Sequence, residues 1–134
     1  MKGIYRLNVL SAFVVSSIFV TVCHAGSNLS YDCVGMDSTG AKMSSTLTLT
    51  PTDKSNDYTS LWTYSTPGST PDKGTVQMLG TNRMLEHSQD QQGVEKGQTE
   101  LYQINDKQLL ISYESMDMAN KLKQKSMGLC SMMN

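Results

Sequence analysis

Histidine is nearly absent from this sequence, which has only His24 and His87, and the short motifs of common catalytic machinery are missing. There is no Gly-x-Ser-x-Gly run, no His-Glu-x-x-His run and no glycine-rich phosphate loop. A Ser–His–Asp triad would have to use His87, because His24 lies in a segment that we expect to be removed. The sequence therefore predicts a protein that is not an enzyme and uses no cofactor, with a hydrolase as the least favoured alternative.

Long runs of one charge are also missing. The chain has 11 Lys and Arg residues against 12 Asp and Glu residues, which gives a net charge of −1. Lys2 and Arg6 lie in the N-terminal segment that we expect to be cleaved, so the remaining balance is 9 − 12 = −3. A protein that binds nucleic acid needs a basic surface to meet the phosphates, so we expect no nucleic-acid partner.

No hydrophobic run is long enough to span a bilayer. The most apolar stretch, Leu7–Val22, has 16 residues, whereas a transmembrane helix needs roughly 20. It follows two basic residues, and small residues, Cys23 and Ala25, stand at the third and first positions before Gly26. This arrangement is typical of a secretory signal peptide. We predict cleavage after Ala25, which leaves residues 26–134 as one secreted or periplasmic domain without a stable membrane span.

Two alternatives to a cleaved signal peptide are an uncleaved anchor and a lipoprotein acylated on Cys23. The short apolar run argues against the anchor. Bacterial lipoprotein signals place Gly, Ala or Ser before the acylated cysteine, whereas Val22 stands there in this chain.

Cysteine is scarce, and its placement is informative. Of three cysteines, Cys23 would leave with the signal peptide, so Cys33 and Cys130 alone would remain. An isolated pair in an oxidising compartment forms a disulfide by default. The closed loop has close to 100 residues, for which the chain-entropy model gives a stabilisation of about 4–5 kcal/mol. Two free thiols that serve as ligands or nucleophiles are the alternative.

The remaining sequence favours strands, because apolar and polar residues alternate over short runs between polar turns. In Met43–Thr50, for example, Leu47 and Leu49 alternate with threonines. We expect a polar loop over Gln89–Gly97 and, over Ser115–Lys123, either a helix or a loop followed by a strand end. The eight predicted strands are Leu29–Val34, Met43–Thr50, Tyr58–Tyr64, Gly74–Leu79, Arg83–His87, Thr99–Ile104, Gln108–Tyr113 and Lys125–Met132.

This rhythm predicts a mostly β fold, a single up-and-down antiparallel barrel or half-barrel of about eight strands. A disulfide between Cys33 and Cys130 would join the first strand to the last, where an antiparallel meander must close to hide its edges.

Two resemblances accompany this prediction. The runs Leu61-Trp62-Thr63-Tyr64, Gly74-Thr75-Val76 and Leu101-Tyr102-Gln103-Ile104 resemble small secreted bacterial proteins with a lipocalin-like or avidin-like β-meander. The frame of Tyr31-Asp32-Cys33 and Cys130 is similar to the periplasmic inhibitors of c-type lysozyme. That family carries a Ser-Gly-x-x-Tyr loop, which this chain lacks, so the inhibitory function does not carry over.

Tyr58, Trp62 and Tyr64 are the candidate ligand-binding residues, because they share one face of a strand. Aromatic side chains can line the mouth of a barrel and take an apolar or sugar ligand. They can equally be the packed core of a barrel whose interior is full.

Methionine is unusually common, and Met116 and Met118 are candidate metal ligands. The run Tyr113-Glu114-Ser115-Met116-Asp117-Met118 resembles the aromatic-x-x-Met-x-Met run of small periplasmic copper carriers. Thioethers suit Cu(I). However, Tyr113 replaces that family's tryptophan and Asn105 replaces its histidine, and methionine is also a flexible filler of cores and interfaces.

We therefore expect a secreted, monomeric, non-catalytic binding protein. A protein-facing role, as an inhibitor or as a surface or host-interaction factor, is slightly favoured over a small-ligand role. A periplasmic Cu(I)-binding protein is the alternative from another chemical class.

Overall fold

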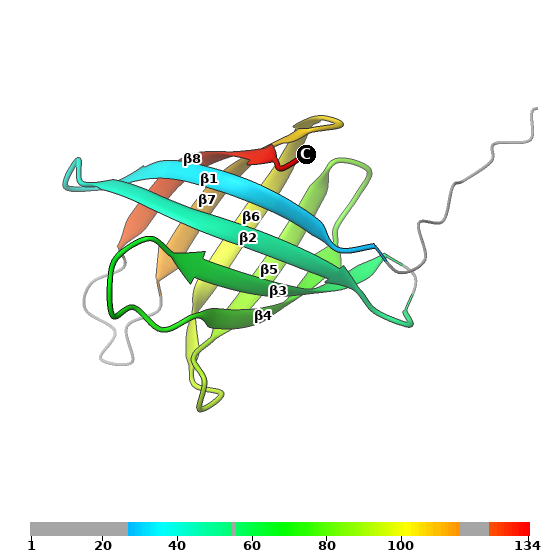
Figure 1. Ribbon diagram of the computed structural model, residues 1–134. Coiled ribbons are helices and arrows are strands. Elements are labelled where there is room, and N and C mark those ends of the chain that lie inside the picture. Colours follow the sequence, from blue (N-terminus) through cyan, green and yellow to red (C-terminus); the bar gives the residue numbers. More distant parts are fainter. Residues whose placement is uncertain (1–26, 55, 116–123) are drawn as a thin grey trace, which may run out of the picture.

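The chain folds as a closed antiparallel β-barrel in which each strand pairs with the next and the first pairs with the last (Figure 1). The computed structural model describes residues 27–54, 56–115 and 124–134. The eight strands are β1 (Leu29–Asp37), β2 (Lys42–Pro51), β3 (Asp57–Tyr64), β4 (Asp72–Met78), β5 (Arg83–Gln89), β6 (Glu95–Asn105), β7 (Gln108–Ser115) and β8 (Lys125–Met132). Of the two predicted architectures, the chain therefore adopts the complete barrel.

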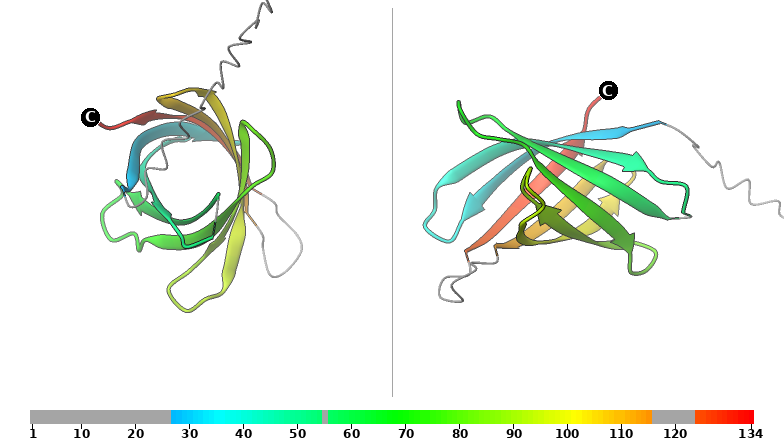
Figure 2. Two further views of the ribbon diagram at one scale, coloured as in Figure 1. Left: turned by 90° about the vertical axis from the view of Figure 1, so that its right-hand side faces the viewer. Right: turned by 90° about the horizontal axis from the view of Figure 1, so that it is seen from below.

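The barrel closes between β1 and β8, as the ring of strands in Figure 2 shows. Cys33 and Cys130 are direct partners in the register of these two strands, and their sulfurs form the predicted disulfide. The bridge thus reinforces the seam where the two ends of the meander meet. A buried disulfide is compatible with an oxidising compartment.

Alternation along the strands separates the interior from the surface. In β2, Leu47 and Leu49 are fully buried, while the threonines between and after them face outward. This confirms the predicted half-buried strand, since successive side chains of a strand point to opposite faces.

The apolar core fills one half of the barrel interior. This half lies toward the β2–β3, β4–β5 and β6–β7 turns, and its side chains come from all eight strands. Among its most buried members are Tyr31, Leu47, Leu49, Val76, Leu101 and Leu109.

The other half of the interior carries smaller side chains. It lies toward the β1–β2, β3–β4 and β5–β6 connections, where the inward positions follow from the alternation of each strand. The small residues at these positions are Gly35, Ser45, Gly74, Ser88, Gly97, Ser126 and Gly128. Neighbouring atoms fill the space beside Gly35, Gly74, Gly97 and Gly128, since a Cβ atom there would lie less than 3.0 Å from another atom, so only a small volume of this half stays open.

The turns at this small-residue end repeat one local design. Asp90 accepts hydrogen bonds at Oδ1 from the backbone N–H groups of Gln92 and Val94, both at 2.9 Å, and Gly93 adopts a positive φ of 82°. Asp37 and Gly40 form the equivalent turn between β1 and β2. Side-chain carboxylates mimic a backbone turn in this way, and glycine supplies the positive φ at no steric cost.

The predicted loop over Gln89–Gly97 is too long. β5 continues to Gln89 and β6 begins at Glu95, because the compact Asp90 turn lets the two strands pair almost to their ends. Of the expected helix or loop over Ser115–Lys123, Ser115 is the last residue of β7, and residues 116–123 lie outside the described part of the chain.

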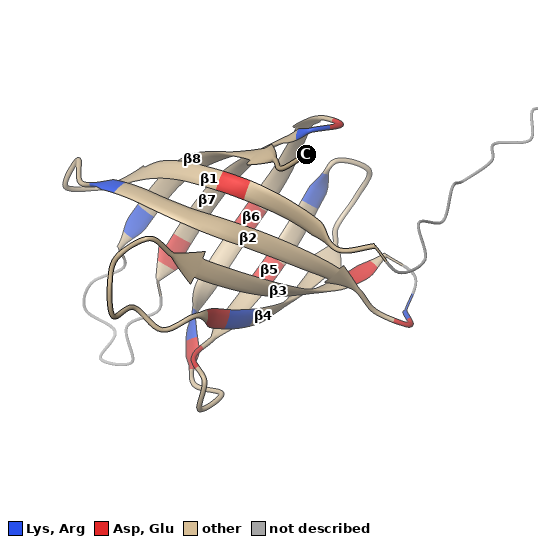
Figure 3. Ribbon diagram, viewed as in Figure 1, with Lys and Arg blue, Asp and Glu red and all other residues tan. Residues whose placement is uncertain are grey.

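The described residues contain no helix of the length and apolarity needed to cross a bilayer. Charged residues of both signs are scattered among the strands and turns, and Figure 3 shows no broad patch of one sign on this side of the barrel.

Candidate functional site

A cavity of about 60 Å³ occupies the small-residue half of the barrel. Its wall includes Ser45, Trp62, Tyr64, Ser88, Thr99 and Tyr113. These residues come from five different strands, β2, β3, β5, β6 and β7, and their inward positions follow from the two-residue period. Hydroxyl groups and aromatic rings thus face one another across a space that the small inward side chains leave open.

Glu86, on β5, is the most unusual residue near this cavity because its side chain is completely buried. Its Oε1 accepts hydrogen bonds from the hydroxyl of Ser60 and from the indole Nε1 of Trp62, the latter at 2.7 Å. Among the described residues, no donor is in hydrogen-bonding position to its Oε2. Oε2 thus has no hydrogen bond of good geometry, although the side chain of Thr99 lies near enough to lower the pKa of the carboxyl group.

Gly74 makes room for this carboxyl group. A Cβ atom at this position would lie 2.7 Å from Oε1 of Glu86 and 2.6 Å from the backbone oxygen of His87. Because residue 74 on β4 is a glycine, the Glu86 carboxyl group can turn toward Ser60 and Trp62 on β3.

Burial raises the pKa of Glu86, since the charged form loses its hydration inside the barrel. The side chains of Ser60, Thr99 and Trp62 act in the opposite direction, because they stabilise the carboxylate. The negative charge of Asp72 raises the pKa further. Desolvation outweighs the donors, so the structure holds this acid with an increased affinity for a proton.

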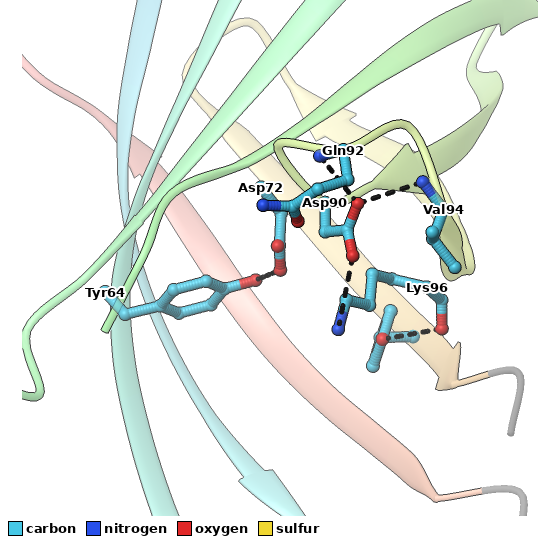
Figure 4. A network of polar contacts seen from close by, with 7 residues as sticks. Tyr64, Asp72, Asp90, Gln92, Val94 and Lys96 are labelled. Carbon is cyan, nitrogen blue, oxygen red and sulfur yellow. Dashed lines mark hydrogen bonds and ion pairs between the residues drawn. The ribbon is translucent and has the colours of Figure 1, made fainter. Parts of the chain in front are cut away.

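Asp72 is a second carboxylate at the same end of the barrel. It accepts a hydrogen bond of 2.7 Å from the hydroxyl of Tyr64, which Figure 4 shows beside the Asp90 turn. Burial raises the pKa of Tyr64, and the hydrogen bond to Asp72 adds to this effect. The phenol is therefore neutral and acts as a hydrogen-bond donor.

Tyr113 reaches the cavity across Gly97. A Cβ atom on Gly97 would lie 2.8 Å from the Tyr113 ring, so the ring occupies the space that a side chain on β6 would take. Its hydroxyl donates to the backbone oxygen of Lys96 at 3.3 Å. Burial raises the pKa of Tyr113, and the negative charges of Asp72 and Glu86 raise it further.

The structure divides the three predicted aromatic residues. Trp62 and Tyr64 line the cavity. Trp62 is also a member of the apolar core, and Tyr64 and Tyr58 both pack against that core, but Tyr58 does not line the cavity. The predicted metal ligands Met116 and Met118 lie outside the described residues, so the Cu(I) hypothesis stays a prediction.

Glu86 and Asp72 did not emerge from the sequence. The available signal was the alternation in Arg83–His87, where Met84 and Glu86 share one face and Leu85 and His87 share the other. Each face carries a single apolar residue, since Arg83 also lies on the face of Leu85 and His87, so alternation alone does not say which face is buried.

A metal centre built from conventional ligands is not apparent in the described part of the chain. No group of three or more His, Cys, Asp or Glu side chains comes together there. The polar side chains that line the cavity are instead hydroxyls and an indole, which suit hydrogen bonding.

No protein-family model and no curated protein matches this chain. Among solved structures, it is similar to a de novo designed fluorescence-activating β-barrel, with a TM-score of 0.59 and 11% sequence identity over 78% of this chain and 91% of the other. A structure described as a de novo design of transmembrane β-barrels has a TM-score of 0.48, with 11% identity over 79% of this chain and 94% of that one. The first likeness supports the antiparallel barrel fold, which is consistent with the lipocalin-like resemblance.

Proposed function

We propose that this protein is an exported, non-catalytic barrel that binds a small ligand in the small-residue half of its interior. The observation that carries the proposal is the cavity lined by Trp62 and Thr99, the two residues that also contact the buried carboxyl group of Glu86. Binding sites are typically concave and apolar, with a few placed polar groups that fix the orientation of the ligand. Tyr64, Tyr113 and Thr99 supply such a mixture here.

The size of the cavity limits what it can enclose. At about 60 Å³, it is far smaller than the roughly 300–1,000 Å³ of sites that bury a drug-sized ligand. The proposed ligand therefore inserts a group of only a few heavy atoms, and any larger remainder stays at the mouth.

Trp62 offers a direct measurement, since it is the only tryptophan of the chain and lines the cavity. We would titrate small neutral, cationic and anionic compounds against the purified protein and follow the fluorescence of Trp62. Ser45→Phe fills the cavity from β2. Ser44→Phe adds the same ring at the next residue, which is exposed, and is the matched control.

The expected result is saturable binding of at least one compound class to the wild type and to Ser44→Phe. Ser45→Phe should weaken this binding by about tenfold or more, because its ring would take the ligand's place. If no compound binds, or if Ser45→Phe binds as the wild type does, the small-ligand proposal is refuted.

Export is the second part of the proposal, and its support is the N-terminal sequence together with the buried disulfide. Mass spectrometry of the native protein should find Gly26, or a residue within a few positions, at the N-terminus. A protein that retains Met1 in the cytoplasm would contradict export.

A protein-facing role is the second candidate, and an exposed apolar patch favours it. Val34 and Met36 on β1 and Met127 on β8 are 62%, 50% and 59% exposed, and Met36 and Met127 are cross-strand partners. Contiguous apolar surface of this kind often marks a protein interface. Chemical cross-linking in the exported fraction should give a defined partner for the wild type, and Val34→Ser with Met127→Ser should lose that partner.

A further inference from the structure

The buried carboxyl group of Glu86 has no basic partner in the described part of the chain. The ion pairs found there join Arg83 to Glu100, His87 to Glu95 and Lys96 to Asp90, all on partly exposed side chains. The side chains that stabilise the Glu86 carboxylate, those of Ser60, Trp62 and Thr99, are neutral groups. A buried carboxylate without a compensating cation is costly, so this position is prepared for a positive charge that the described residues do not supply.

The surroundings of the cavity strengthen this electrostatic preference. Among the described residues that line it, none is a lysine or an arginine. The negative charge of Asp72 raises the pKa of Glu86, and the negative charges of Asp72 and Glu86 raise the pKa of Tyr113. An anion would be repelled from the ionised site, and a neutral molecule would leave Glu86 in the protonated form that burial favours, whereas a cation would stabilise its carboxylate.

The aromatic walls suit the apolar part of an organic cation. Trp62, Tyr64 and Tyr113 all line the cavity. The faces of such rings attract ammonium groups and also pack against methylene groups. A bare divalent metal ion would instead need several oxygen ligands, whereas Glu86 offers one free oxygen.

We propose that the cavity binds an alkylammonium group whose N–H donates to Oε2 of Glu86 while its methylene groups contact the aromatic walls. This inference rests on the proposed small-ligand function and names the chemical class of the ligand. The ammonium can belong to a free amine or to a lysine side chain of a partner protein, because the cavity encloses only the end of either.

Glu86 is not itself among the described residues that line the cavity, and its Oε2 is buried behind the wall. Thr99 pairs with Glu86 across β5 and β6, and Trp62 donates to the other carboxyl oxygen; both residues also line the cavity. A turn of the Thr99 side chain about χ1 is a rotamer change, which costs little compared with a charge-assisted hydrogen bond. The proposal therefore requires this turn of Thr99, which would open a path to the buried Oε2 while the strands stay in place.

Three probes of similar shape separate charge from size. Pentylammonium, 1-pentanol and pentanoate carry a cationic, a neutral and an anionic head on the same chain, and Trp62 fluorescence reports their binding. Glu86→Gln keeps the shape of the side chain but removes its charge. Glu95→Gln makes the same change on a partly exposed side chain near the Asp90 turn and is the matched control.

The wild type should bind pentylammonium at least about tenfold more tightly than 1-pentanol and should not bind pentanoate. Glu86→Gln should remove this preference and leave the affinity for 1-pentanol unchanged, and Glu95→Gln should behave as the wild type does. Equal binding of alcohol and ammonium, or an unchanged preference in Glu86→Gln, would overturn the ammonium site but leave the small-ligand function standing. If none of the compounds tested binds, both proposals fail together.

A second measurement covers the case in which Glu86→Gln does not fold. The ¹³C resonance of the Glu86 carboxyl group in the wild type should shift on addition of pentylammonium and should not shift with 1-pentanol to the same extent. An unchanged resonance at saturation would overturn the proposed contact.

Nα-acetyl-lysine N-methylamide then identifies the source of the ammonium group. Binding comparable to that of pentylammonium supports a lysine side chain of a partner protein. A loss of about tenfold or more supports a free amine, because the peptide groups then collide at the mouth.

Discussion

Removal of the Cys33–Cys130 disulfide is the perturbation whose magnitude follows most directly from the structure. The bridge joins residues separated by 97 positions and ties the two strands that close the barrel. Both cysteines are buried in the core, with 2% and 0% of their surface exposed. We would replace both by alanine, since serine would bury an unpaired hydroxyl group.

The chain-entropy model gives the expected loss of stability. For a loop of this length, the cross-link removes entropy from the unfolded chain that corresponds to about 4.7 kcal/mol at 25 °C. Domains of ordinary stability unfold with about 5–15 kcal/mol, so the loss is a large part of the total. It corresponds to a decrease in Tm of roughly 15 °C or more for a domain near 100 residues.

Urea unfolding followed by Trp62 fluorescence measures this loss. We expect a free energy of unfolding about 3–5 kcal/mol lower for the double alanine variant, and a larger m value, since an uncrosslinked chain exposes more surface when it unfolds. Wild-type protein reduced before unfolding is the control, because it loses the bridge but keeps both sulfur atoms in the core. A loss below about 1 kcal/mol in both samples would refute the reasoning, since the pairing of β1 with β8 would then need no covalent support.

Three further predictions concern stability. Burial raises the pKa of Glu86 above its value in the unfolded chain, so wild-type stability should fall as the pH rises from 4.5 through the raised pKa. Glu86→Gln should lack this decrease. Urea unfolding of both proteins between pH 4 and pH 8 tests the prediction, and a pH-independent difference in their stability would contradict it. Gly97→Ala should lower the free energy of unfolding by about 1–3 kcal/mol, because the added Cβ would overlap a backbone oxygen of β7. Gly80→Ala, with open space around the residue, should change it by less than about 0.5 kcal/mol. Equal effects of the two substitutions in thermal unfolding would be inconsistent with this packing. Leu101→Ala should cost about 2–5 kcal/mol as a cavity in the core, whereas Leu110→Ala, 37% exposed on the outer face, should cost less than about 1 kcal/mol in the same assay.

Local sequence signals predicted most of the fold. Alternating residues located the strands, and the compact Asp90 turn accounts for the excess length of the loop predicted over Gln89–Gly97. With only Cys33 and Cys130 left after the predicted cleavage, the disulfide had a single pairing to adopt. The shared face of Trp62 and Tyr64 also followed from the two-residue period alone.

The sequence by itself thus determined the strands, the faces of strands such as β2 and β3, and the disulfide, because each depends on neighbours along the chain or on a unique pair. Only the tertiary structure decided that the meander closes completely and that Glu86 lies inside it. The burial of Glu86 depends on Ser60 and Trp62 from β3, Thr99 from β6 and the space left by Gly74 on β4. These contacts depend on the register of several strands at once, and no local periodicity encodes which side chains then meet across the barrel.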